Sequence, residues 1–170
     1  VCSSDVKKFP GEVLTQPEIQ AIIKTFSNSS LGIRNRALFT IYLRSQLRCK
    51  EALSLHPCHV NLNDCAITVI NGKGGKRRVV GIDRASADVL RKWASIRPNS
   101  EFFFCTLKGN RIHDSCVRRM VKSHAAKAKI TRRVHIHGLR HTGANQLFEE
   151  GIDLRIIQKQ LGHSSLAVTD

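Results

Sequence analysis

The sequence predicts a mainly α-helical domain that contains one small antiparallel β-sheet. Apolar residues recur at helical spacing through most of the chain, whereas between about His59 and Ile82 the period shortens to an alternation typical of strands. A glycine-rich segment, NGKGGK at residues 71–76, interrupts this alternation and predicts a hairpin turn. The length of 170 residues suits one domain with a substantial core.

The N-terminal part of the domain is expected to form two helices. Thr15 and Glu18 have the spacing of a capping box, and Pro17 suits a first helical turn, so the first helix is expected to begin there. Residues 33–42 supply the apolar face of the second helix. The sole tyrosine, Tyr42, lies on that face and is expected in the core.

A short third helix is expected to start with Ser45 as its N-cap and to end before Pro57. In this register Arg48 and Ala52 share one face, so Arg48 would point toward packing residues. Glu51, three positions on, can bond and orient the guanidinium. An ordinary surface pair of this kind would contribute little to stability.

The alternating segment predicts two or three antiparallel strands, the last two of which flank the NGKGGK turn. Lys73 and Lys76 would then lie at the tip of a mobile hairpin. Lysines on a glycine-rich tip are usually solvated charge, and the Gly-Lys pattern does not match a P-loop.

Two more helices are expected next. Asp83 can cap a helix that carries Leu90 and Trp93 and ends near Pro98, and Ser115 can open another. The second of these helices is basic on the side opposite its packing residues. Its basic residues, and those that follow it, are Arg118, Arg119, Lys122, Arg132 and Arg133. A helix of this kind can lie in the major groove of DNA, although a merely solvated face gives the same pattern.

The C-terminal stretch predicts two helices separated by glycines. Residues 138–150 have helical apolar spacing, and Gly151 suits the end of that helix. Asp153 is the expected N-cap of the next helix, which Gly162 would end, so His163 is expected in a tight turn. In the first of these helices Arg140 shares a face with apolar residues. A buried guanidinium needs an anionic partner, although an arginine on such a face can also lie along the surface and reach solvent.

The charge balance points to a polyanionic partner. The chain carries 28 Lys and Arg against 13 Asp and Glu, a formal net charge of +15 with a pI near 10.2. Such an excess favours nucleic acid, with a ribosome-like or solubilising basic surface as the alternative. Aromatic residues make up only 5%, which argues against single-strand or RNA binding on stacking platforms. Double-stranded DNA is therefore the expected partner.

Cysteine usage and the chain ends predict the context of the domain. The six cysteines form no CxxC pair or disulfide-scaffold spacing, so we expect reduced thiols in a cytoplasmic protein. A His/Cys cluster within residues 56–65 matches no standard zinc finger, and no metal site is expected. No apolar run is long enough to span a membrane, and no signal peptide is evident. Residues 1–13 are typical of an interdomain linker, and 14–170 are expected to be one domain of a longer protein.

Four strings, in their order along the chain, resemble motifs of the tyrosine recombinases, the family of phage integrases, Xer-type recombinases and integron integrases. They are QLRCKEALSL, NGKGGKRRVV, HIHGLRHTGA and LGHSS. VLTQPEIQAII is similar to the start of the family's catalytic domain, so the resemblance covers nearly the whole chain. Each string is loose alone, whereas four in the right order are specific. One mild departure is Gln46, which stands where a glycine is common.

The resemblance implies the family's catalytic-domain fold, and DNA cleavage and rejoining through a 3′-phosphotyrosine without ATP or a metal. The two arginines would clamp the non-bridging phosphate oxygens, and the lysine would be the general acid for the leaving 5′-oxygen. The histidines would donate hydrogen bonds, and the first would help to deprotonate the nucleophile. The implied catalytic residues are Arg48, Lys73, His137, Arg140 and His163, with Glu51 holding Arg48.

The nucleophile is the main departure from the family. Its members carry a tyrosine shortly after the LGH histidine, and that position falls just beyond Asp170. This chain is therefore expected to bind DNA without forming a covalent intermediate. The parent protein is expected to be a recombinase with an upstream DNA-binding domain and to act as a homo-tetramer on synapsed DNA. A binding-only regulator that kept the fold is the alternative, although the general-acid lysine and both arginines favour the enzyme. A metal-dependent nuclease would need clustered carboxylates, and the sequence offers no convincing set.

Overall fold

A computed structural model describes residues 13–70 and 77–162 of the chain. The helices are α1 (Gln16–Lys24), α2 (Ser30–Arg44), α3 (Cys49–Leu53), α4 (Arg84–Ile96), α5 (Asp114–Lys127), α6 (Ile136–Glu149) and α7 (Leu154–Leu161), with a 3₁₀ turn η1 (Pro57–His59). The strands are β1 (Val60–Asn61), β2 (Ala66–Val69) and β3 (Arg78–Gly81), which form an antiparallel sheet in the order β1-β2-β3. The predicted fold class, mainly helical with a small antiparallel sheet, is confirmed.

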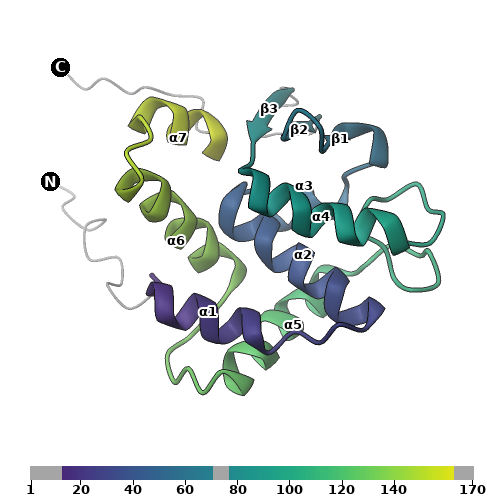
Figure 1. The fold of residues 1–170 in the computed structure, drawn as a ribbon, viewed down its shortest axis with the longest axis horizontal. Coiled ribbons are helices and arrows are strands. Elements are labelled where there is room, and N and C mark those ends of the chain that lie inside the picture. Colours follow the sequence, from purple (N-terminus) through teal and green to yellow (C-terminus); the bar gives the residue numbers. More distant parts are fainter. Residues whose placement is uncertain (1–12, 71–76, 163–170) are drawn as a thin grey trace, which may run out of the picture.

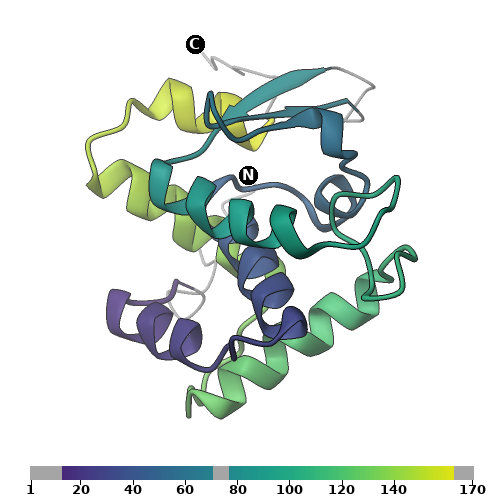
Figure 2. The ribbon, with the colours of Figure 1, turned by 45° about the vertical axis from the view of Figure 1, so that its right-hand side comes forward.

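Helix α2 is the central element of the fold. It packs against α4, α6 and α3, while α1 and α5 lie at one end of the molecule and the sheet lies with α7 at the other (Figures 1 and 2). Strand β3 is in contact with α7, and β2 pairs with β3 in the register Ile67 opposite Val80. The proposed linker at residues 1–13 falls almost entirely outside the described residues.

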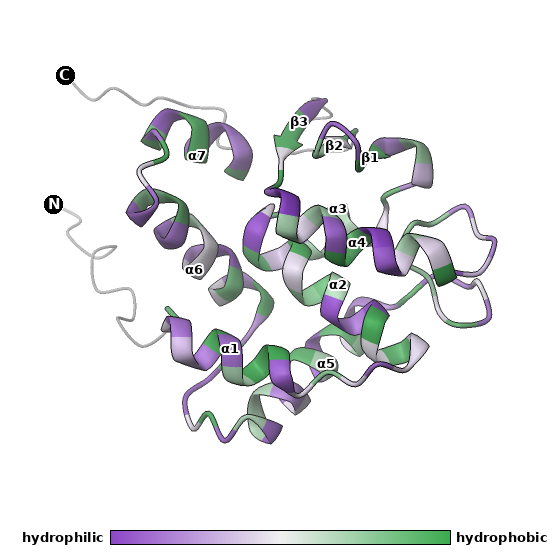
Figure 3. Ribbon diagram, viewed as in Figure 1, coloured by the Kyte–Doolittle hydropathy of each residue, from purple (hydrophilic) through white to green (hydrophobic). Residues whose placement is uncertain are grey.

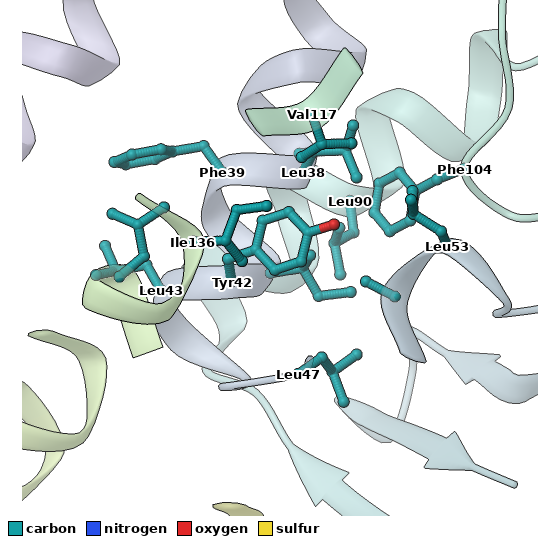
Figure 4. Packing of buried hydrophobic residues seen from close by; sticks show 14 of the residues in the cluster. Leu38, Phe39, Tyr42, Leu43, Leu47, Leu53, Leu90, Phe104, Val117 and Ile136 are labelled. Carbon is teal, nitrogen blue, oxygen red and sulfur yellow. The ribbon is translucent and has the colours of Figure 1, made fainter. Parts of the chain in front are cut away.

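The core surrounds Tyr42 of α2. Its ring lies among side chains from α2, α3, α4 and α6 (Figure 4). Because Tyr42 is fully buried, the expectation of a core tyrosine is confirmed. Trp93 of α4 is also buried, and its indole N–H donates a 2.9 Å hydrogen bond to the carbonyl oxygen of Phe103. That contact holds the extended segment after α4 against the core.

Hydrophobic and hydrophilic residues are interspersed along the helices (Figure 3). The second half of α2 is buried nearly all round, since residues 37–39 and 41–43 are all buried. Among the described residues, no helix is both long enough and apolar enough to cross a membrane.

Local capping signals place most helix starts correctly. Thr15 and Glu18 form the predicted capping box of α1, and Asp83 caps α4 by accepting from the N–H of Ser86 at 2.8 Å. Asp153 caps α7, whose end is marked by Gly162 at φ +69°. Helices α5 and α6 begin one and two residues earlier than predicted, since His113 and His135 serve as their N-caps.

The start of α3 is where the sequence prediction was wrong. Ser45 is the C-cap of α2, not the N-cap of α3, and its hydroxyl donates to the carbonyl of Ile41. Gln46 follows at φ +53°, a left-handed conformation that explains why a glycine suits this turn. Helix α3 then starts after Arg48, so this arginine precedes the helix instead of pointing from its packed face. Pro57 opens η1 rather than simply ending α3.

Arg44 fastens α2 to the neighbouring helices at its C-terminal end. Its Nε donates to Asp83 at 2.8 Å, and both terminal nitrogens donate to the carboxylate of Glu150 at 2.8 Å. These contacts tie the end of α2 to the start of α4 and the end of α6. The helix that carries Arg140 is thereby fixed relative to the turn that carries Arg48.

Gly143 allows α6 to cross α2 in direct backbone contact. A Cβ built at this position would lie 1.6 Å from the carbonyl oxygen of Leu43, and the residue is buried. No side chain fits without separating the two helices.

We predict that Gly143→Ala destabilises the domain by on the order of 3 kcal/mol, because the added methyl group meets backbone, which cannot move aside. The measurement is urea denaturation followed by circular dichroism. Gly81→Ala is the matched control, since its Cβ would have no neighbour nearer than 3.7 Å. Equal stability of the two variants would show that the crossing tolerates a side chain.

Candidate functional site

A groove of about 480 Å³ opens between the start of α3, helix α5 and the start of α6. Basic side chains dominate its walls. The lining residues are Arg48, Cys49, Arg118, Arg133, His135, Ile136, His137 and Arg140. The structure therefore brings together three of the predicted site residues: Arg48 from the first string, and His137 and Arg140 from the string HIHGLRHTGA.

Glu51 is the carboxylate that organises the arginines beside this groove. The backbone N–H of Arg48 donates to its Oε2 at 2.8 Å, and Nη1 of the same residue donates to Oε1 at 3.0 Å. The predicted contact between Arg48 and Glu51 is thus confirmed. Arg78 adds a second guanidinium in a forked geometry, from Nη1 to Oε1 at 2.9 Å and from Nη2 to Oε2 at 2.8 Å.

Glu51 is ionised at neutral pH although it is buried. Burial by itself would raise the pKa of its carboxyl group, but hydrogen bonds from Arg78 and from the backbone of Arg48 outweigh that effect and hold the pKa below its ordinary value of 4.5. The pair is therefore not the weak surface contact that the i,i+3 spacing alone would suggest.

Arg140 lies on the buried side of α6, as its position in the sequence predicted. Its side chain donates from Nη2 to the carbonyl oxygen of Leu161 at 3.2 Å, while Nη1 is buried without a hydrogen-bond partner among the described residues. Burial, with the positive charges of Arg48 and Arg78 adding to it and Glu51 opposing, lowers the pKa of Arg140 to about 10. The guanidinium stays protonated at pH 7, so a charged donor in this site still lacks an acceptor.

Positive charge is in excess at this point of the structure. Arg48, Arg78 and Arg140 share the neighbourhood of Glu51, and repulsion from the other two guanidiniums adds to burial in lowering the pKa of Arg140. Three guanidiniums against one carboxylate leave two positive charges uncompensated within this cluster. A bound anion with several oxygens would compensate that charge.

The histidines of α6 stand at the rim of the groove. His135 accepts from the N–H of Gly138 at 3.1 Å, and its ring stacks 6.4 Å from that of His137. His137 and His141 are joined through their Nε2 atoms at 2.9 Å. One of these two nitrogens must donate the hydrogen and the other must accept it, so the contact fixes the orientation of both rings.

The basic residues predicted to contact DNA fall into distinct settings. Arg118 pairs with Asp114 on α5 and reaches the groove, which Arg133 also lines. Arg132 forms an ion pair with Glu18 of α1, where a DNA phosphate would have to compete with that carboxylate. The DNA-contact role of Arg132 stays a prediction, as do those of the exposed residues Arg119 and Lys122 of α5. Lys73, Lys76 and His163 lie outside the described residues.

Arg78 is the site residue that sequence reasoning missed. It was assigned only to the alternating apolar run, yet it shares a strand face with buried Val80, while Arg77 and Val79 are exposed. The available signal was an arginine at a strand position whose side chain points toward the core, because a charge there needs a buried partner.

Within the described residues, no group of three or more His, Cys, Asp or Glu side chains is placed to hold a metal ion.

Comparison with known sequences gives a family match over almost the whole chain. The sequence model of the phage integrase family matches residues 12–170. Curated relatives at 30% identity include the tyrosine recombinase XerC of Actinobacillus succinogenes and the tyrosine recombinase XerD of Ralstonia nicotianae, each aligned over 166 residues. The alignments cover 95% and 93% of this chain and 56% and 54% of those proteins. The chain thus spans about half the length of the curated relatives it matches.

Solved structures agree with this match. The crystal structure of XerA recombinase has a TM-score of 0.81 at 29% identity, over 92% of this chain and 58% of that one. The structure of the XerH recombinase bound to its difH substrate in a pre-cleavage complex has a TM-score of 0.76 at 27% identity, over 97% of this chain and 50% of that one. The lambda integrase catalytic core, at 17% identity, shares the fold, with a TM-score of 0.73 over 89% of this chain and 91% of that one.

We predict that Glu51 makes part of the domain's stability depend on pH. Because its pKa is lowered in the folded state, its contribution is present above about pH 4.5 and is lost as the pH falls below that value. Glu51→Gln should be less stable than the parent at pH 7 and should lose less stability on acidification. Urea denaturation at a series of pH values from 7 to 3 measures this convergence. A constant difference between the two proteins across that range would contradict the assignment.

Proposed function

Because this chain belongs to the phage integrase family of tyrosine recombinases, we propose that it is the catalytic domain of a site-specific DNA recombinase. The observation that carries the proposal is the surplus of two positive charges around Glu51, beside a groove lined with basic residues. A DNA phosphodiester is an anion of suitable size and valence for such a site.

The proposed reaction transfers a DNA phosphate to a tyrosine of the complete protein. The tyrosine hydroxyl gives up its proton with the help of His137 and its oxygen attacks phosphorus. The bond from phosphorus to the 5′-oxygen breaks, and a 3′-phosphotyrosine forms. Arg48 and Arg140 hold the non-bridging oxygens, on which negative charge increases in the transition state. Lys73 gives its proton to the leaving 5′-oxygen, while His137 and His163 donate hydrogen bonds to the phosphate.

The contacts of the two arginines support these roles. Arg48 makes one side-chain hydrogen bond to Glu51, from Nη1, and lines the groove, so its other nitrogens can face a ligand. Arg140 also lines the groove, with Nη2 anchored on Leu161 and a buried Nη1 that has no hydrogen-bond partner among the described residues. Both guanidiniums are thus held in place beside the groove by protein contacts, which is the preorganisation that transition-state stabilisation requires.

Tyr42 does not qualify as the nucleophile. It is the one tyrosine of the 170 residues, it is buried in the core, and burial raises the pKa of its hydroxyl group. We therefore propose that the nucleophile belongs to a longer form of the protein. From the resemblance to the family, we also propose an upstream DNA-binding domain in the complete protein and its assembly as a homo-tetramer on synapsed DNA.

We predict that the chain binds duplex DNA mainly through charge. If about six phosphates are neutralised, log K should fall against log salt with a slope of about −5. Lys122→Ala should weaken binding to all sequences alike and reduce the slope by about 1. Fluorescence anisotropy over a salt series measures both effects.

Lys92→Ala is the control for this titration. It removes an exposed positive charge from α4, which lines no part of the groove as the structure describes it. It should leave the slope unchanged. If the DNA affinity of the parent protein does not change with salt concentration, the proposed interface is excluded.

We predict that Lys73 acts as the general acid, and a comparison of two leaving groups, a 5′-oxygen and a 5′-thiolate, tests this role. In a chain extended past Asp170 through the family's tyrosine, a nicked suicide substrate should trap a covalent adduct. Lys73→Ala should slow cleavage of a normal 5′-oxygen and spare a 5′-thiolate, which leaves without a proton. Arg140→Ala should slow both substrates by on the order of a hundredfold, since the phosphate clamp serves both.

Two results of that experiment would change the proposal. Equal slowing of both substrates by Lys73→Ala would reduce the lysine to a DNA contact. Duplex binding without any adduct, by an extended chain that contains a tyrosine at this position, would favour a binding-only regulator.

A further inference from the structure

We infer that Arg78 is a positioning residue, which keeps Arg48 open toward the phosphate and fixes the end of α7. The inference rests on the proposed function, because it concerns the same phosphate site. Arg78 belongs to β3 and does not line the groove, so it would act through Glu51 and through α7 rather than by touching DNA.

The guanidinium of Arg78 is used on all three nitrogens. Nη1 and Nη2 hold the two oxygens of Glu51, and Nε donates to the carbonyl oxygen of Gln160 at 3.2 Å. The side chain is only 10% exposed. One residue thus joins β3 to the carboxylate that binds Arg48 and to the last turn of α7.

Occupation of Glu51 by Arg78 determines how Arg48 can bind. A carboxylate and a guanidinium by themselves prefer a forked pair with two parallel hydrogen bonds. Here Arg78 takes that geometry, and the backbone N–H of Arg48 takes a further site on Oε2. Arg48 is left with a single side-chain bond to Oε1, and its side chain is 37% exposed. Without Arg78, Glu51 would draw Arg48 into the fork and away from the groove.

The same guanidinium sets the end of α7. The last carbonyl groups of a helix lack intrahelical partners, and here Gln160 and Leu161 find them in Arg78 and Arg140. The side chain of Gln160 returns a bond to the carbonyl of Gly81 at 3.1 Å. A Cβ at Gly162 would lie 3.2 Å from Cζ of Arg78, so the glycine leaves room for the guanidinium.

Arg78→Lys tests the inference because it keeps the charge and removes the fork. A lysine has one nitrogen and cannot hold both oxygens of Glu51 and the carbonyl of Gln160 in this geometry. Arginine side-chain NMR of the 170-residue chain, titrated with inorganic phosphate, would report the affinity at Arg48 and Arg140. We expect phosphate to bind about tenfold more weakly in Arg78→Lys. Arg77→Lys, at the exposed neighbouring position, should match the parent.

A double variant separates positioning from a general loss of structure. If Arg48 is captured by Glu51 in the absence of the fork, then Glu51→Gln in the Arg78→Lys background should release it and recover part of the phosphate affinity. Loss of structure predicts the reverse, because the second substitution removes another buried contact. In the extended chain, Arg78→Lys should lower the cleavage rate at saturating DNA more than it lowers DNA affinity.

The outcomes distinguish the inference from the proposed function. If phosphate does not shift the NMR signals of Arg48 and Arg140 in the parent chain, both the inference and the proposed function are overturned. If phosphate shifts those signals with the same affinity in the parent and in Arg78→Lys, the inference alone is overturned. If Arg78→Lys fails to fold, Arg78→Gln is the second variant, since its amide can donate to one oxygen of Glu51 but cannot form the fork. Unchanged phosphate affinity in that folded variant would reject the positioning role.

Discussion

Glu51 balances only part of the positive charge that the fold gathers around it, and this imbalance governs the site. A lone buried carboxylate would favour its neutral form, but two guanidiniums keep it charged. A third guanidinium, that of Arg140, is buried near the first two and is destabilised by them. The cluster therefore holds repulsion that the phosphate of the proposed DNA substrate would relieve, so that part of the proposed binding energy would come from groups already in place.

The three arginines around Glu51 are held in two ways. Packed helices of the core position Arg48 and Arg140, whereas a small sheet far along the chain positions Arg78. Arg140 lies on α6, which crosses α2 at Gly143 in direct backbone contact, and Arg48 lies in the turn that follows α2. Arg44 fastens the end of α2 to α4 and α6 beside that turn. Arg78 comes from a small sheet that reaches the site through α7 and Glu51. Strand β3 and α7 add buried apolar residues, Val80 and Ile157, and Arg78 joins both elements to Glu51 and to the end of α7 through polar contacts.

Local signals in the sequence predicted what is determined locally. Caps such as Thr15, Asp83 and Asp153 act within a few residues, so their helices start where the sequence says. Ser45 misled the prediction because the same hydroxyl can serve the end of one helix or the start of the next, and packing of α2 decides between them. Arg78 and Arg132 have partners far away in the sequence, which no spacing rule reveals. The order of motifs along the chain singled out Arg48 and Arg140, and the i,i+3 spacing predicted the contact of Arg48 with Glu51, but neither revealed Arg78 as the second partner of Glu51.

Gln46 shows how the turn before Arg48 is constrained by its neighbours. Its left-handed backbone costs on the order of 1 kcal/mol relative to glycine, and both polar atoms of its buried amide lack partners among the described residues. Its Nε2 lies 3.5 Å from where a Cβ of Gly143 would be, so the side chain occupies the space beside that glycine. A glycine at position 46 would relieve the backbone but would leave that space empty at the helix crossing. The departure from the family's common residue is therefore compensated by packing, and the turn still delivers Arg48 to Glu51.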